Sequence, residues 1–129
     1  MENSSVWAPV LGYEGFYEVS SDGEVRSLTR QLSYGRHGHA TYKGRALKPY
    51  RLGKYLGVGL ALRGVVRSSY IHEIVLRAFV GPRPVTESRG EIRHLDGQKT
   101  NNCLSNLAYG TIQENVADRM KHKQMKAAK

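Results

Sequence analysis

The chain has 129 residues, the size of about one domain, and 40% of them are hydrophobic, which allows a modest core. Its net charge of +9 and its pI near 9.9 come from 20 Lys and Arg against 11 Asp and Glu, and no apolar run is long enough to span a membrane. The single cysteine, Cys103, excludes a disulfide framework and a cysteine zinc site, and the first five residues lack the features of a signal peptide. We therefore expect a protein of a reducing, cytoplasmic compartment.

Basic residues are concentrated in one part of the chain. Residues 25–72 contain ten Lys and Arg and no acid. Such a stretch indicates a polyanion binder. Nucleic acid is the expected partner, with acidic membranes and a merely solvated basic surface as alternatives.

The first 70 residues have the pattern of short antiparallel strands. β-forming residues and turn glycines alternate over residues 7–30, and Asp22-Gly23 between two such runs is a hairpin signal. We expect Trp7 to anchor the core rather than to stack on bases. Residues 31–44 are polar and contain glycine, which predicts a mobile loop. Residues 45–70 read as further strands with a turn at Arg63-Gly64.

The hydrophobic period then changes from that of a strand to that of a helix. Ile71, Ile74, Val75, Ala78 and Phe79 lie at helical spacing, which predicts an amphipathic helix. We expect Ser68 or Ser69 to cap its start and Gly81-Pro82 to end it. Residues 83–90 are expected to form a polar linker.

A compact strand, loop, strand and helix unit follows. Residues 91–95 read as a strand, residues 96–105 as a loop, and residues 106–109 as a returning strand that Gly110 breaks. Thr111 to Glu114 form a capping box at the start of a second helix, and the tail from Lys121 is basic.

This unit resembles the HNH nucleases, whose core is the ββα-metal motif. The matching residues are the runs His94–Asn102, Ser105–Leu107 and Thr111–Asn115. The predicted helix Ile71–Phe79 is similar to the helix that precedes this core in phage and intron-encoded HNH homing endonucleases. The N-terminal run Trp7–Leu28 resembles the NUMOD-type DNA-binding motif of those proteins.

The resemblance implies a role for three residues. His94 matches the general base that takes a proton from water, although a histidine on a strand is by itself more typical of the core. Asn106 matches the Asn that holds the loop and orients the base. Asn115 matches a metal ligand on the helix, where the alternative is an ordinary polar residue. An imidazole suits a base at neutral pH, and an oxygen ligand suits Mg²⁺ or Mn²⁺.

One position departs from the family pattern. Many HNH nucleases have Asp, a second metal ligand, directly before the base, and here that position is Arg93. Either Asn115 holds the ion with water and phosphate oxygens, or an acid nearby substitutes, with Asp96, Glu114 and Asp118 as candidates. Arg93 itself is suited to contact a phosphate.

The remaining candidates are expected to bind DNA or to support the fold. We expect His72 to have a structural or phosphate-contacting role, and His37 and His39 to lie in a loop near DNA. Asp96-Gly97 is first of all a turn. The expected contacts to the DNA backbone are Arg26, Arg45, Lys48, Arg51, Lys54, Arg63, Arg67, Arg93 and Lys99.

Together these features predict an α+β fold. We expect a β-rich DNA-binding region at residues 1–70, a helix with the nuclease core at 71–120 and a basic tail at 121–129. The expected activity is metal-dependent hydrolysis of duplex DNA by a phage or mobile-element protein in a bacterial host. The alternatives are a DNA-binding protein with an inactive HNH core, and an RNA-binding or RNA-cutting protein.

Two further expectations concern how the DNA is cut. Oligomeric state stays open between monomer and homodimer, and one active site in a monomer would nick a single strand. The chain ends about 14 residues after Asn115, without the C-terminal helix-turn-helix that such homing endonucleases often carry, so we expect relaxed sequence specificity.

Overall fold

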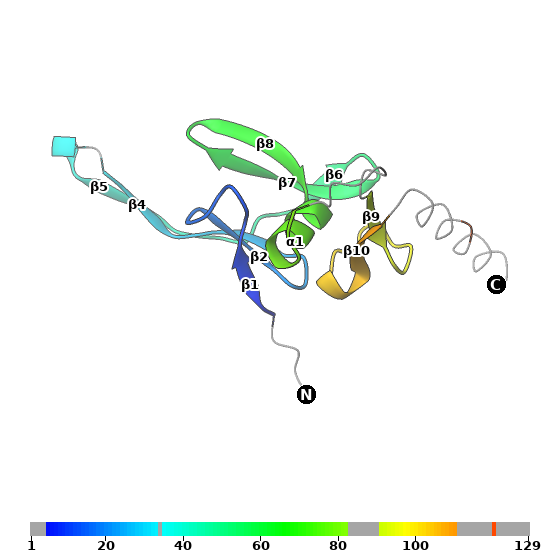
Figure 1. The fold of residues 1–129 in the computed structure, drawn as a ribbon. Coiled ribbons are helices and arrows are strands. Elements are labelled where there is room, and N and C mark those ends of the chain that lie inside the picture. Colours follow the sequence, from blue (N-terminus) through cyan, green and yellow to red (C-terminus); the bar gives the residue numbers. More distant parts are fainter. Residues whose placement is uncertain (1–4, 34, 83–90, 111–119, 121–129) are drawn as a thin grey trace.

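The computed structural model describes residues 5–33, 35–82, 91–110 and 120. Over these residues it confirms the α+β class, with antiparallel strands around the helix α1 (Figure 1). The elements are β1 (Trp7–Pro9), β2 (Tyr17–Ser20), β3 (Val25–Ser27), β4 (Arg30–Ser33), the 3-10 turn η1 (Gly35–His37), β5 (His39–Tyr42), β6 (Tyr50–Leu52), β7 (Tyr55–Leu62), β8 (Val65–Tyr70), α1 (Ile71–Phe79), β9 (Glu91–His94), the 3-10 turn η2 (Leu104–Asn106) and β10 (Leu107–Gly110).

The described strands form four antiparallel sheets. Their orders are β1-β2-β3, β4-β5, β6-β7-β8 and β9-β10. The hairpin predicted around Asp22-Gly23 is present, since β2 pairs with β3 and Val19 faces Val25. The turn at Arg63-Gly64 is also confirmed, and both of its residues have positive φ, as two-residue hairpin loops require.

Residues 31–44 are not the loop that their composition predicted. β4 and β5 pair from Arg30↔Tyr42 to Ser33↔His39, and this hairpin projects from the body of the molecule (Figure 1). The pairing satisfies backbone groups of both strands, while β5 buries no side chain fully. Without a buried face there is no apolar alternation in the sequence to reveal a strand.

The helix α1 follows β8 without a break, which makes one prediction about it wrong. Its N-cap residue is Tyr70, which makes no side-chain capping bond, because Ser68 and Ser69 are still paired with β7. Its end is as expected: Gly81 has φ of 127°, and its N–H donates to the carbonyl of Leu76.

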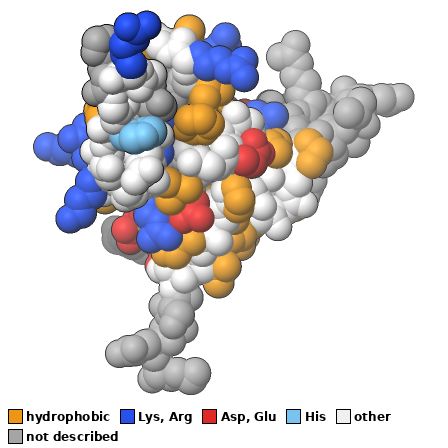
Figure 2. Space-filling view, turned by 90° about the vertical axis from the view of Figure 1, so that its left-hand side faces the viewer, with side chains coloured by type: hydrophobic (Ala, Val, Ile, Leu, Met, Phe, Trp, Pro, Cys, Tyr) orange, Lys and Arg blue, Asp and Glu red, His pale blue; other side chains and the backbone are white. Residues whose placement is uncertain are grey.

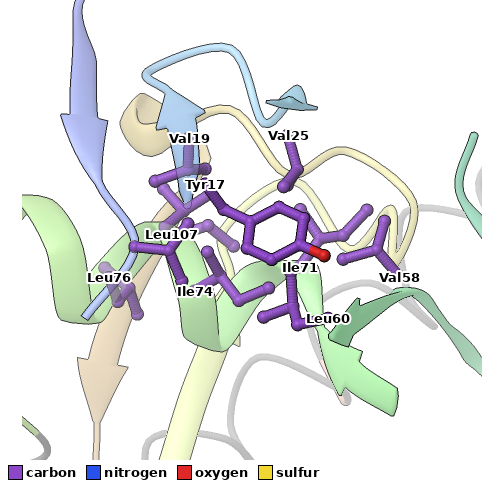
Figure 3. Close-up of a cluster of buried hydrophobic side chains, with 11 residues drawn as sticks. Tyr17, Val19, Val25, Val58, Leu60, Ile71, Ile74, Leu76 and Leu107 are labelled. Carbon is purple, nitrogen blue, oxygen red and sulfur yellow. The ribbon is translucent and has the colours of Figure 1, made fainter. Parts of the chain in front are cut away.

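The hydrophobic core joins the N-terminal strands to α1 and β10. Val19, Leu60, Val75 and Leu76 are among its most buried side chains, and Leu107 contributes from β10 (Figure 3). The hydroxyl of the buried Tyr17 accepts a hydrogen bond from the Ala61 N–H at 2.9 Å, which ties β2 to β7. The described residues up to Tyr70 and the helix that follows them therefore share a single core.

Candidate active site

His94 is the last residue of β9 and faces Leu107 of β10 in the ladder. Its side chain is 9% exposed, and its Nε2 lies 3.2 Å from Oδ1 of Asn102. Because a carboxamide oxygen only accepts, Nε2 carries the proton and Nδ1 is the basic nitrogen. Burial lowers the pKa of His94, against the bond to Asn102 and the charge of Asp96, which raise it; Lys99 also lowers it. The imidazole is thus uncharged at neutral pH and able to accept a proton.

Asn106 holds the loop between β9 and β10. Its Oδ1 accepts from the Asp96 N–H at 2.9 Å, and its Nδ2 donates to the Asp96 carboxylate and to the Asn101 carbonyl, each at 2.9 Å. It lies in η2, one residue before the strand that it was expected to open. The three bonds hold Asp96, two residues after the end of β9, against the other end of the loop.

The turn between β2 and β3 packs against the same loop from the other end of the sequence. The Leu104 N–H donates to the Ser21 carbonyl at 2.8 Å. A Cβ on Gly23 would lie 2.7 Å from the Asn102 carbonyl oxygen, so only glycine fits there. This contact positions Asn102, which sequence reasoning missed as a partner of His94. In the sequence, Asn102 stood out only as one residue of the HNH-like motif.

Two aromatic rings, those of Tyr55 and His72, lie against His94, and the ring of Tyr70 packs behind them. The ring of Tyr55 stacks on His94, with centroids 5.6 Å apart and an interplanar angle of 24°. His72 meets His94 edge to face at 5.2 Å and stacks on Tyr70 at 5.1 Å. His72 is only 7% exposed, which favours the packing role expected for it over contact with phosphate. Tyr55 and Tyr70 were not among the predicted site residues, because neither lies near His94 in the sequence.

The described residues do not by themselves form a metal site. No group of three His, Cys, Asp or Glu among them is placed to hold an ion. Asp96, one proposed substitute ligand, accepts bonds on both carboxylate oxygens, from Asn101, Gln98 and Asn106. Desolvation raises the pKa of Asp96, but these bonds together lower it. Asn115, Glu114 and Asp118 lie outside the described residues.

Arg93 lies beside His94 on β9 and faces Ala108 in the ladder. Successive residues of a strand point to opposite faces, so its side chain leaves the sheet on the face away from His94. Its aliphatic part packs over Gly110, where a Cβ would collide with it. Gly110, expected to break the second strand, is instead the last residue of β10, and its lack of a side chain makes room for Arg93.

Three of the predicted DNA-binding residues line one open cleft. Arg51 lies in β6 and Lys54 in the turn that follows it, and Lys99 lines the same cleft from the loop that follows His94. A second cleft is lined in part by Trp7, Arg26 and Arg45. These basic side chains therefore converge in pairs or triplets rather than forming one continuous strip.

Arg26 of the second cleft is already engaged in an ion pair, and the remaining basic candidates lie apart from both clefts. Arg26 bonds to Glu18 at 2.7 Å and lies 3.7 Å over the ring of Trp7, which is half-buried. Arg63 is at the tip of the β7–β8 hairpin, and Lys48 and Arg67 are exposed. Figure 2 shows several groups of Lys and Arg on the side toward which the hairpins project, with few acids between them.

Comparisons with known proteins agree with this arrangement. Residues 6–60 match the NUMOD4 motif, and residues 69–117 match an HNH endonuclease family. The chain is 31% identical over 116 residues to the DNA endonuclease I-HmuI of Bacillus phage SP01, a match that covers 88% of this chain and 57% of that protein.

A solved structure gives the same result at the level of the fold. It is described as showing DNA binding and cleavage by the HNH homing endonuclease I-HmuI, and it superposes with a TM-score of 0.69 at 29% identity, covering 92% of this chain and 59% of the other. The chain thus spans a little over half of the relative that it matches. It is built of a NUMOD4 motif followed by an HNH endonuclease domain, as its sequence motifs predicted.

Proposed function

We propose that this chain is a DNA endonuclease that hydrolyses phosphodiester bonds with His94 as the general base. The observation that carries the proposal is the environment of His94: its side chain is buried and held through Nε2 by Asn102, within a β9–β10 unit that matches the HNH domain. DNA binding and cleavage by the related homing endonuclease support DNA as the substrate.

The proposed reaction uses water as the nucleophile. Nδ1 of His94 accepts a proton from water, the water oxygen bonds to phosphorus, and the bond from phosphorus to the 3′ oxygen breaks. The departing oxygen takes a proton from solvent, which leaves 5′-phosphate and 3′-hydroxyl ends. Asn115 is the proposed ligand of Mg²⁺ or Mn²⁺, which when bound supplies positive charge beside the scissile phosphate. Asn106 keeps the loop closed so that His94 does not turn away.

The proposed phosphate contacts are the basic side chains of the clefts. Arg51, Lys54 and Lys99 line a cleft that includes the loop that follows His94. If about six Lys and Arg side chains neutralise phosphates, log K for duplex DNA falls with log salt at a slope of about −5. Lys54→Gln is expected to reduce that slope by about 1 at every DNA sequence.

The test is conversion of supercoiled plasmid by the wild type and by His94→Ala, each with Mg²⁺, Mn²⁺ or EDTA. His39 is not in the loop expected for it but is exposed on β5, far from β9 and β10 (Figure 1), so His39→Ala is the matched control for loss of the proposed base. We expect nicked circles that require the ion, disappear in His94→Ala and persist in His39→Ala. Linear product without a nicked intermediate would instead indicate two coupled active sites, as in a dimer. Equal cutting by the wild type and His94→Ala would exclude His94 as the base.

A DNA-binding protein with an inactive nuclease core is the second candidate. Arg93, at the position where many family members carry an acidic ligand, favours it. Tight plasmid binding without conversion under any condition would support this candidate, and Arg93→Asp would then be the variant to assay. Competition between duplex DNA and RNA for the same protein separates either candidate from an RNA-directed activity.

A further inference from the structure

Tyr55 is the ring that lies against the face of His94. The two centroids are 5.6 Å apart, and the planes are inclined by 24°, an offset stack. Tyr55 is held in turn by Tyr70, edge to face at 5.7 Å, and by His72 at 4.7 Å. Tyr55 begins β7, and its ladder partner is Leu52 of β6.

We propose that Tyr55 is a positioning residue for the base in the reaction proposed above. The bond from Nε2 to Asn102 fixes one atom of the imidazole. The ring can still rotate about the line that joins its Cβ to Nε2. A flat ring stacked on one face, with His72 against it from the side, removes that rotation. Nδ1 is then held toward a single position of the attacking water, as proton transfer requires.

The contact between Tyr55 and His94 also joins the two parts of the chain that match different families. Tyr55 lies within residues 6–60, which match the NUMOD4 motif, whereas His94 lies within the HNH endonuclease match. Lys54, directly before Tyr55, lines the basic cleft with Lys99. One turn of the DNA-binding motif thus carries both a proposed phosphate contact and the platform beneath the base. The DNA-binding motif is therefore part of the active site.

The test compares Tyr55→Phe, which keeps the ring, with Tyr55→Leu, which removes it. Tyr13→Leu is the matched control, since half-buried Tyr13 also packs edge to face on a tyrosine, Tyr17, at 5.8 Å. We expect Tyr55→Leu to lower kcat for plasmid nicking about three- to tenfold with KM nearly unchanged, the range that the loss of one aromatic pair predicts. Tyr55→Phe should retain the wild-type kcat, and so should Tyr13→Leu.

A second readout does not depend on activity. Proton NMR of the His94 ring reports the shielding that a stacked Tyr55 ring produces, and the resonance is assigned by its absence in His94→Gln. In Tyr55→Leu it should move downfield, while in Tyr55→Phe and Tyr13→Leu it should stay. If Tyr55→Leu does not fold, Tyr55→Met, which also lacks a ring, takes its place.

Three outcomes would overturn the proposal: an unchanged His94 resonance in the ringless variant, an unchanged kcat, or a loss of kcat that Tyr55→Phe shares. A wild-type protein that does not nick DNA overturns the proposed function instead, and the resonance then still decides whether Tyr55 stacks on His94.

Discussion

Replacing Gly23 with Ala tests whether the β2–β3 turn supports the active site. Gly23 has φ of 89°, and a Cβ would lie 2.7 Å from the Asn102 carbonyl oxygen and 2.9 Å from the Asn102 Cβ. Gly12 is a control that the chain itself provides, since its φ is 87° and nothing lies within 4 Å of its Cβ position. The two substitutions introduce the same backbone strain, and only one of them pushes on Asn102.

The magnitudes follow from these contacts. Gly12→Ala should lower the free energy of unfolding by about 1 to 2 kcal/mol, the cost of a left-handed conformation for an L-residue. Gly23→Ala adds about 1 to 3 kcal/mol for overpacking, because Asn102 must retreat by several tenths of an ångström. That retreat stretches the 3.2 Å bond to His94 toward the limit of a hydrogen bond. We expect nicking by folded Gly23→Ala to be slower by about tenfold.

Urea unfolding gives the two free energies, and plasmid nicking is measured at a temperature where circular dichroism shows both variants folded. Gly12→Ala should nick at the wild-type rate. If Gly23→Ala matched Gly12→Ala both in stability and in rate, the turn would not hold Asn102, and the reasoning from this contact would be wrong.

Four further predictions concern the site and the core. Asn106→Ala removes three side-chain hydrogen bonds and should lower the free energy of unfolding in urea by about 2 to 4 kcal/mol; an unchanged value would mean that the loop closes without them. Because burial lowers the pKa of His94, nicking should persist below pH 6.5 and be lost only as the pH falls through the folded-state value. Stability should also decline as the pH falls from about 6.5 toward that value, since the unfolded chain takes up the proton first; His94→Gln, measured in parallel, should lack this decline. Tyr17→Phe leaves the Ala61 N–H without its acceptor and should cost about 1 to 3 kcal/mol in thermal unfolding, and no loss would contradict the tie between β2 and β7.

The parts of the fold that the sequence predicted are those with a strong local signal. Asp22-Gly23 determines a tight turn, Arg63-Gly64 supplies the positive φ of another, and the period of Ile71, Ile74 and Val75 identifies a helix face. The β4–β5 hairpin was missed because β5 has no buried face. The cap was misplaced because serine hydroxyls in a paired strand look the same in the sequence as serine caps.

The motif indicated the candidate site residues, and their contacts with distant segments are visible only in the structure. His94 and Asn106 stand out because they lie within a recognisable run of residues. Asn102, Gly23 and Tyr55 act through contacts between distant segments; Cys103 and Asp22, for example, touch across 81 residues of sequence. The hydrophobic periodicity of a sequence does not predict such contacts.

A local rule, in contrast, could have predicted the ion pair that Arg26 forms. The hairpin signal also sets the strand register, and that register places Glu18 opposite Arg26. The ion pair between them therefore follows from the turn that the sequence already showed.

The single core has a consequence for how the two motifs can be inherited. Val19 and Leu60 from the first motif pack with Val75 and Leu107 from the second, so neither motif can bury its apolar side chains alone. We expect one cooperative unfolding transition, with the amides of β2, β7 and α1 exchanging their hydrogens through the same global opening. Recombination that brought in one motif from a distant relative would join mismatched halves of a core. The two motifs should therefore be inherited together.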